Sequence, residues 1–328
     1  MSHKAPGRSD REGISLLELA DMFPTEEAAV MWFEKWTWPD GEINCLRCGS
    51  CNAYRVKSGK PMPYRCRDCR KYFSLKTNTA MEASNLPLRK WAYAIYLEIT
   101  SLKGVSSLKL RRDLKIAQSS AWFMLHRIRQ GLNAERQRMF EGPVEVDESY
   151  FGGKRKSMSN AKRKELQGTG RGPVGKAAVV GVKDRATGKV AAQVIKTTDA
   201  PTLRGFVDAH ADPAADVYTD GATAYKGRKN HEAVKHSVGE YVRYLAGATV
   251  HTNGVESFWS MLKRGYMGVY HRMSHKHLQR YVNEFAGRHN IRDMDTIDQM
   301  AHVVAGMVGR RLAYRDLTAD NGRSRVAS

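Results

Sequence analysis

The sequence has no run of 18 apolar residues, so no segment is suited to cross a membrane as a helix. Its first residues, MSHKAPGRSDREG, lack the apolar stretch of a secretory signal. We therefore expect a cytoplasmic protein with no membrane partner. Acidic residues are outnumbered, because 34 Asp and Glu stand against 54 Lys and Arg, which gives a net charge of +20. So large a surplus indicates a polyanionic partner, with nucleic acid as the first candidate and simple solubility as the alternative.

Cysteine is also scarce, but four of the five cysteines are regularly spaced. Two C-x2-C pairs, Cys45 with Cys48 and Cys66 with Cys69, are separated by 17 residues. This spacing is typical of a zinc ribbon, in which four thiolates hold one structural Zn²⁺ and leave no open position for a substrate. Two disulfides are the alternative, which a reducing cytoplasm disfavours. Cys51 breaks the symmetry of the pairs, and we expect it to have no role in the site.

Helical patterns flank the ribbon. Residues 14–37 read as helices with a start at Thr25, and 87–104 reads as an amphipathic helix begun by Pro87. Two short helices follow in 105–132, joined by a turn near 115–118. This is a helix-turn-helix-like pattern that offers Arg127 and Arg129 to DNA, although an ordinary helical connector would look similar.

From residue 144 onward, apolar residues recur at every second position, as in a strand. VEVDESY, AAVVGVKD and KVAAQVIK are predicted strands, followed by a helix over 201–210, the strand DVYTD and a further strand over 233–238. Three helices are expected to begin near residues 253, 274 and 296. This order predicts an α+β fold. The predicted domains are an N-terminal helical segment (1–40), the zinc ribbon (41–76), a helical DNA-binding region (77–140), a catalytic domain (141–312) and a loose tail (313–328).

Three acids stand at the ends or starts of these elements. Asp147 lies on the first strand, Asp220 ends DVYTD 73 residues later, and Glu256 lies 36 residues further on, in the first turns of a helix that Asn253 could cap. Each acid alone is most simply a surface carboxylate. Glu145 shares the strand face of Asp147 and Glu148 follows it, and we expect both to lie beside the site without binding metal.

The blocks around these acids make a specific resemblance. VEVDESYFGGKRK, VYTDGATAY and HTNGVESFWSMLKRGY, together with the N-terminal zinc ribbon, resemble the DDE transposases of bacterial insertion sequences. The match runs from the ribbon to the last helices. It implies a ribonuclease H-like, retroviral-integrase-like catalytic domain with a mixed sheet and flanking helices.

The resemblance also implies the chemistry. Asp147, Asp220 and Glu256 would hold two Mg²⁺ (or Mn²⁺) ions, and the enzyme would cleave DNA ends at terminal inverted repeats and join the 3′-hydroxyls to target DNA. Lys263 stands two helical turns after Glu256 on the same face, and by resemblance contacts DNA beside the cleavage site. Two double-stranded DNA ends must be brought together, so we expect a homodimer or a larger synaptic assembly, associated with the nucleoid.

A basic segment follows the first strand. Residues 151–176 carry eight basic residues against Glu165 alone, with several glycines, and we expect this loop to order on DNA. A solvated charged loop is the alternative. The expected DNA contacts are Arg264, next to Lys263 on its helix, and, in this segment, Lys154, Arg155, Lys156, Lys162, Arg163 and Lys164.

Two other functions use the same features. A zinc-ribbon DNA-binding regulator would carry an inactive catalytic domain, yet all three acids are present. A nuclease or resolvase of the same fold would cut without joining, and only the family resemblance disfavours it.

Overall fold

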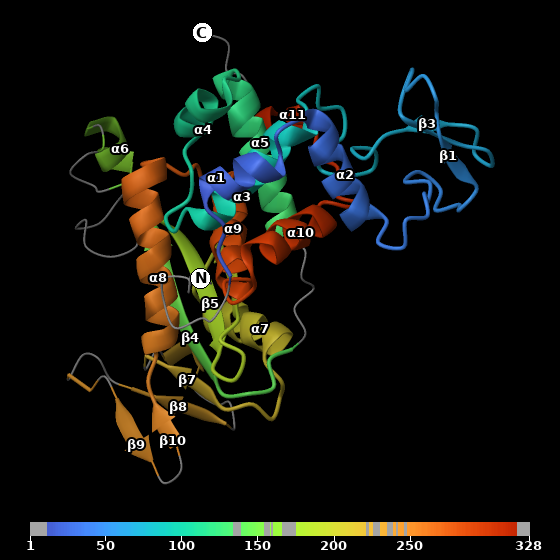
Figure 1. The fold of residues 1–328 in the computed structure, drawn as a ribbon. Helices are drawn as coiled ribbons and strands as arrows, with labels where there is room; N and C mark the ends of the chain where they lie inside the picture. Colours follow the sequence, from blue (N-terminus) through green and yellow to red (C-terminus); the bar gives the residue numbers. More distant parts are fainter. Residues whose placement is uncertain are drawn as a thin grey trace. The chain divides into compact units, whose positions relative to one another are not determined.

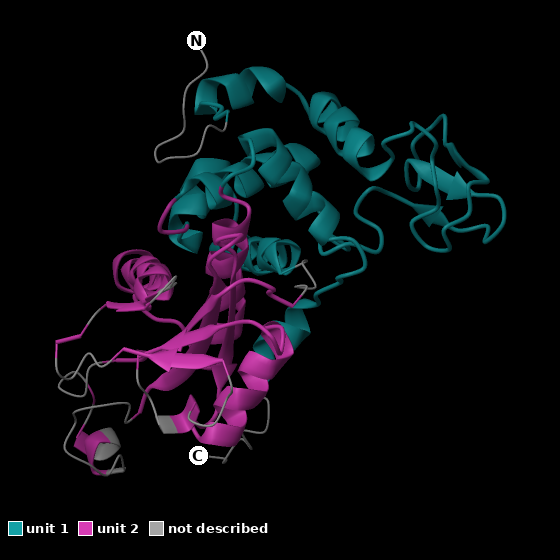
Figure 2. Cartoon of the chain, turned by 90° about the horizontal axis from the view of Figure 1, so that it is seen from below, with its two compact units in different colours: residues 1–101, 105–134, 293–328 teal, residues 102–104, 135–292 magenta. Residues whose placement is uncertain are grey.

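A computed structural model describes residues 12–133, 139–153, 158, 160–165, 175–220, 223–225, 230–234, 239–240, 242–245 and 248–319. The chain divides into two compact units, coloured separately in Figure 2. Unit 1 comprises residues 1–101, 105–134 and 293–328, and unit 2 comprises residues 102–104 and 135–292.

Unit 1 is helical apart from the ribbon. Its helices are α1 (Leu16–Met22), α2 (Glu26–Thr37), α3 (Leu88–Thr100), α4 (Ser107–Leu114), α5 (Gln118–Leu132), α10 (Thr296–Gly306) and α11 (Tyr314–Thr318). Thr25 caps α2 as predicted, because its hydroxyl accepts the N–H of Ala28. Lys115 ends α4 in the left-handed region, at φ 47°, so the turn to α5 closes without a glycine.

The last helices differ from the predicted domain boundaries. α10 packs on α3 and α5 within unit 1, although we expected it in the catalytic domain at 141–312. Gly131 of α5 permits this packing, because a Cβ there would lie 2.4 Å from the carbonyl oxygen of Val303 in α10. α11 lies inside the predicted loose tail, whose residues 320–328 are outside the described residues.

The ribbon is a small antiparallel sheet of β1 (Ala53–Arg55), β2 (Tyr64–Cys66) and β3 (Tyr72–Phe73), in that order. Tyr64 stacks on Phe73 with ring centroids 5.3 Å apart, and the edge of Trp38 meets Tyr64 at 4.9 Å. These aromatic rings give the small domain a core beside its cysteines.

Unit 2 is built on one mixed sheet with the order β6-β5-β4-β7-β8. Figure 1 labels β5, β4, β7 and β8 of this sheet. Its strands are β4 (Val144–Phe151), β5 (Ala177–Asp184), β6 (Val190–Ile195), β7 (Val217–Thr219) and β8 (His231–Ala233). β4, β5 and β6 pair antiparallel, whereas β7 pairs parallel with β4 and with β8. This arrangement is consistent with the predicted α+β, ribonuclease H-like fold.

Helices cover both faces of the sheet. Val144 and Val146 of β4 belong to the core beneath α7 (Ala200–His210), and Phe151 belongs to the core beneath α8 (Asn253–Gly265) and α9 (Leu278–Asn290). Because side chains alternate along a strand, Glu145 and Asp147 share the face that α8 covers. The strand therefore carries two acids toward the helix that bears Glu256.

Several elements of unit 2 differ from the sequence predictions. β8 ends at Ala233, where we expected a strand to begin, and α9 begins at Leu278 and not near residue 274. A hairpin of β9 (Arg243–Leu245) and β10 (Ala248–Val250) was not predicted. Shorter helical segments are α6 (Asn160–Glu165), η2 (Thr223–Tyr225) and the π-helical η4 (Tyr266–Tyr270). Among the described helices, none combines the length and the apolar character needed to cross a membrane.

Candidate active site and zinc centre

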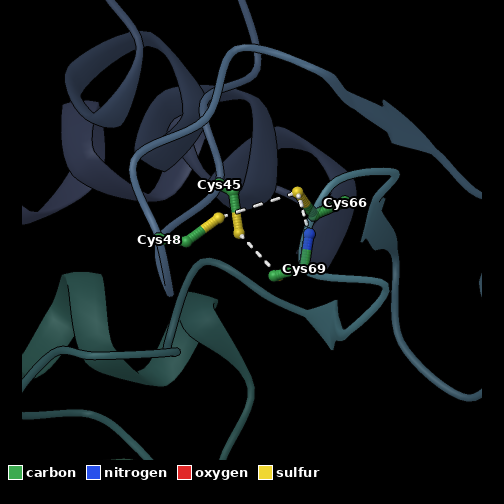
Figure 3. A group of neighbouring side chains, drawn as sticks. All are labelled: Cys45, Cys48, Cys66 and Cys69. Atoms are coloured by element: carbon green, nitrogen blue, oxygen red, sulfur yellow. Dashed lines mark hydrogen bonds between the residues drawn. The ribbon is translucent and has the colours of Figure 1, made fainter.

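The four predicted zinc cysteines converge in the ribbon (Figure 3). Their sulfur atoms all lie within 4.8 Å of one another, with Cys45 to Cys69 at 3.8 Å and Cys48 to Cys66 at 3.7 Å. A tetrahedral zinc ion with bonds of about 2.3 Å to sulfur requires sulfur–sulfur distances of roughly 3.8 Å. The four side chains therefore fit one Zn²⁺, and Cys51 lies outside the group as expected.

Backbone N–H groups donate to two of these sulfur atoms. The N–H of Cys69 points at Sγ of Cys66, 3.5 Å away, and the N–H of Arg47 points at Sγ of Cys45, 3.4 Å away. The hydrogen bond from Cys69 lowers the pKa of Cys66 to about 7, because it stabilises the thiolate. A thiolate available near neutral pH is the form that binds zinc.

The parallel pairing of β4 with β7 brings two acids together. Val144 pairs with Val217, and Asp147 and Asp220 each lie three residues further along their strands. Carboxylate oxygens of Asp147, Asp220 and Glu148 lie within 4.8 Å of one another. Oδ1 of Asp220 is buried, and no described residue donates a hydrogen bond to it. A buried carboxylate oxygen without a donor, facing other carboxylates, suits a divalent cation.

Electrostatics at Asp147 reflect this crowding. Burial, followed by the negative charges of Asp220 and Glu148, raises the pKa of Asp147 to about 7 from its ordinary value of 3.8, and Glu256 adds a smaller contribution in the same direction. Burial also raises the pKa of Glu148, while the hydroxyl of Tyr225, which donates to Glu148, opposes that rise. The charged forms of these acids therefore repel one another unless a cation lies between them.

Glu256 is near this cluster but not part of its closest group. It lies in the first turns of α8, and its Oε1 accepts a hydrogen bond of 2.9 Å from the hydroxyl of the buried Thr252. Glu148, which we expected only beside the site, takes the third place in the close group. No sequence pattern indicated this, because Glu148 points to the opposite side of an ideal strand from Asp147.

The start of α8 differs from the prediction that Asn253 caps it. Thr252 is the N-cap residue, and no side chain at that position caps the helix. Instead, Glu145 of β4 accepts the N–H groups of Gly254 and Val255. A carboxylate 109 residues away in the chain replaces the local cap, which no local pattern could reveal.

Two of the predicted DNA contacts are buried inside unit 1. Arg129 is 2% exposed and pairs with the equally buried Glu98 at 3.6 Å. Arg127 is 5% exposed, donates to the carbonyl of Glu82 and stacks on Phe123 at 3.8 Å. The prediction that these arginines contact DNA is therefore wrong, because their guanidinium groups serve the packing of the helices.

The other predicted basic contacts are placed unevenly. Lys263 and Arg264 are exposed on α8, and Arg163 and Lys164 are exposed on α6. Lys154, Arg155 and Lys156 lie outside the described residues, and the side chain of Lys162 is likewise outside them. These four residues lie on the surface, and their contact with DNA stays a prediction.

Comparisons with known proteins agree with the two units. Residues 24–72 match the family described as the transposase zinc-ribbon domain, and residues 139–290 match the family described as the ISXO2-like transposase domain. An uncharacterized protein in the transposable element ISH50 of Halobacterium salinarum is 28% identical over 280 residues, which cover 82% of this chain and 92% of the relative. No solved structure matches. The chain, with its zinc ribbon and its paired acids on a ribonuclease H-like sheet, belongs to the ISXO2-like DDE transposases of insertion sequences.

Proposed function

We propose that this chain binds the terminal inverted repeats of an insertion sequence, cleaves the DNA ends and joins the 3′-hydroxyls to target DNA. Asp147, Asp220 and Glu256 are the proposed ligands of two Mg²⁺ or Mn²⁺ ions. The observation that supports this best is the meeting of Asp147, in the middle of β4, with Asp220, directly after β7, while the charge of Glu256 acts on Asp147.

The protein supplies a preformed anionic site. Bound divalent ions would stabilise the attacking and leaving oxygens of an in-line displacement at a phosphodiester. The chain's own residues fix the acids: strand pairing fixes Asp147 and Asp220, and the Thr252 hydroxyl orients Glu256. Glu148, held by the Tyr225 hydroxyl, adds a fourth negative charge beside the site.

Basic side chains would hold the DNA around this site. Lys263 and Arg264 are exposed at the far end of the helix that carries Glu256, and they are proposed to bind phosphates next to the reacting one. On the ribbon, Arg65 stacks on Tyr72 at 5.1 Å and Arg67 on Tyr54 at 5.2 Å. Arginines held on aromatic rings lose less conformational freedom on binding, which supports a role of the ribbon in recognising the ends.

A cleavage and strand-transfer assay tests the proposal. Labelled terminal-repeat DNA with Mg²⁺ or Mn²⁺ should give a joined product. A cut product alone would indicate a nuclease or resolvase, and the absence of both products would indicate a DNA-binding regulator.

Asp147→Asn, Asp220→Asn and Glu256→Gln should each abolish cleavage while DNA affinity changes little. Asp208→Asn is the matched control, because this exposed acid on α7 should be dispensable. Retained cleavage in any of the three variants removes that acid from the site.

Assembly is tested with the same DNA. Because two ends must react together, the active species is proposed to be a dimer or larger. Light scattering of the chain with end DNA should give the mass of one complex that holds at least two chains and two DNA ends. A complex of one chain with one end throughout the reaction contradicts this part of the proposal.

A further inference from the structure

Glu145 is a buried acid that the proposed chemistry does not use. It is 2% exposed, yet it lies two residues before Asp147 on the same face of β4. Its Oε2 accepts the N–H of Gly254 at 2.6 Å and the N–H of Val255 at 3.0 Å. The two groups are among the N–H groups at the start of α8 that have no partner within the helix, so the carboxylate also meets the positive end of the helix dipole.

Arg185 completes a connection between three segments. Its Nε donates to Oε1 of Glu145 at 2.8 Å, and its terminal nitrogens donate to the carbonyls of Thr249 and His251, just before α8. The guanidinium also lies 4.4 Å from the ring of Tyr218, on the strand that leads to Asp220. One ion pair therefore contacts the segments that carry all three proposed metal ligands.

The close approach of helix and strand depends on a missing side chain. A Cβ at Gly254 would lie 2.7 Å from Oε2 of Glu145 and 3.1 Å from the side chain of Lys183. Lys183 is the cross-strand partner of Glu145, and its Nζ donates to the carbonyl of Gly254 at 3.3 Å. Glycine at this position lets the start of α8 lie directly on the Glu145 carboxylate.

We propose that Glu145 and Arg185 are positioning residues, which fix the start of α8 against β4 so that Glu256 reaches the metal site formed with Asp147 and Asp220. Glu256 lies two residues after Gly254, so a shift of the helix start moves its carboxylate directly. This inference rests on the proposed function, because it takes Glu256 as a metal ligand.

Binding of Mn²⁺ alone tests it without DNA and without turnover. The zinc-loaded full chain is titrated with Mn²⁺, and free Mn²⁺ is followed by electron paramagnetic resonance. Glu145→Gln replaces one carboxylate oxygen by an amide that cannot accept from both Arg185 and the helix N–H groups. We expect Mn²⁺ affinity to fall by about tenfold or more, the range measured when partners that orient metal ligands are removed.

A double-mutant cycle separates positioning from general destabilisation. If Glu145 acts through Glu256, then Glu145→Gln should weaken Mn²⁺ binding little further in a Glu256→Gln background. Glu284→Gln is the matched control, because Glu284 is a fully buried glutamate of the same unit, bound by Tyr270 and Arg288 beyond the other end of α8. It should lower stability to unfolding without changing Mn²⁺ affinity.

Gly254→Ala is a second route if Glu145→Gln does not fold. It keeps every charge and suits a helix, but it forces Glu145 and α8 apart, so Mn²⁺ affinity should again fall. Unchanged affinity in a folded Glu145→Gln or Gly254→Ala protein overturns the positioning role, as do additive losses in the cycle. If Glu256→Gln itself leaves Mn²⁺ binding intact, the proposed metal site fails first, and the two failures are thereby distinguished.

Discussion

Replacing Asp147 by Asn should stabilise the protein in the absence of added divalent ions. Asparagine has nearly the shape of the protonated acid and carries no charge, so it removes the cost of burying a charge and the repulsion from Asp220 and Glu148. The pKa of Asp147 is raised to about 7 from 3.8. Such a difference between folded and unfolded states corresponds to about 4 kcal/mol at pH 8 as an upper limit.

The stability advantage of Asp147→Asn should grow as the pH rises. Below pH 3.8 the carboxyl is protonated in both states, and the site has no electrostatic cost. As pH rises from about 4 to about 7, the unfolded chain loses this proton and the folded chain keeps it, so wild-type stability falls across that window. The advantage of Asp147→Asn should therefore be larger at pH 8 than at pH 5, by about 2–3 kcal/mol.

Urea unfolding at the two pH values measures the effect, with hydrogen exchange in β4 and β5 reporting on unit 2. The zinc of the ribbon stays bound, because no chelator is used. Added Mg²⁺ should then stabilise the wild type and have little effect on the variant, since a cation offsets the same repulsion. Equal stabilities at pH 8, or an advantage that does not shrink at pH 5, would refute the claim that burial and the neighbouring carboxylates make ionised Asp147 costly in the folded protein.

Further predictions concern the ribbon, the sheet and the charge of the chain. Cys66→Ser should release the bound zinc, measured by a colorimetric chelator, and expose the ribbon to proteolysis while unit 2 keeps its resistance. Gly181→Ala should destabilise unit 2 by about 1–3 kcal/mol in urea unfolding, because the added Cβ would lie 2.6 Å from the Trp259 ring of α8. An unchanged stability would mean that the ring moves freely. The affinity for DNA can be followed by fluorescence anisotropy at different salt concentrations. If at least six phosphates are contacted, it should fall about a thousandfold or more between roughly 50 and 200 mM salt. An affinity that does not change with salt would contradict a phosphate-based interface.

Local patterns predicted the elements that carry their own signals. The alternation around Val144 and Val146 placed β4, and Thr25 placed the start of α2. The cysteine spacing predicted a group of four sulfur atoms that the structure brings together. In each case the determining residues lie within one element or one motif, so a single stretch of sequence contains the information.

Predictions failed where the outcome depends on what packs against an element. Helical periodicity marks one apolar side of α5 but does not show that other elements also cover its remaining sides, so Arg127 and Arg129 were assigned to DNA although both are buried. The hairpin of β9 and β10 is short, and Tyr244 is 81% exposed, so it lacks the alternation by which strands are recognised. The assignment of α10 failed because helices adjacent in sequence need not belong to the same unit.

The acids near β4 illustrate why a metal site needs supporting contacts that its ligands do not reveal. Burial and the charges of Asp220 and Glu148 raise the pKa of Asp147, burial and the charge of Asp220 raise the pKa of Glu148, and nothing among the three acids opposes their separation. The opposing force must come from elements that cannot move apart: the paired strands, the Trp259 ring packed where Gly181 has no side chain, and the Glu145–Arg185 pair at the start of α8. Glu145 itself tolerates burial because the charge of Arg185 offsets its own and two backbone N–H groups also donate to it, whereas Oδ1 of Asp220 has no described donor. Two carboxylates on neighbouring strands are thus distinguished by their partners: protein groups satisfy Glu145, and Asp220 is left for the proposed cation.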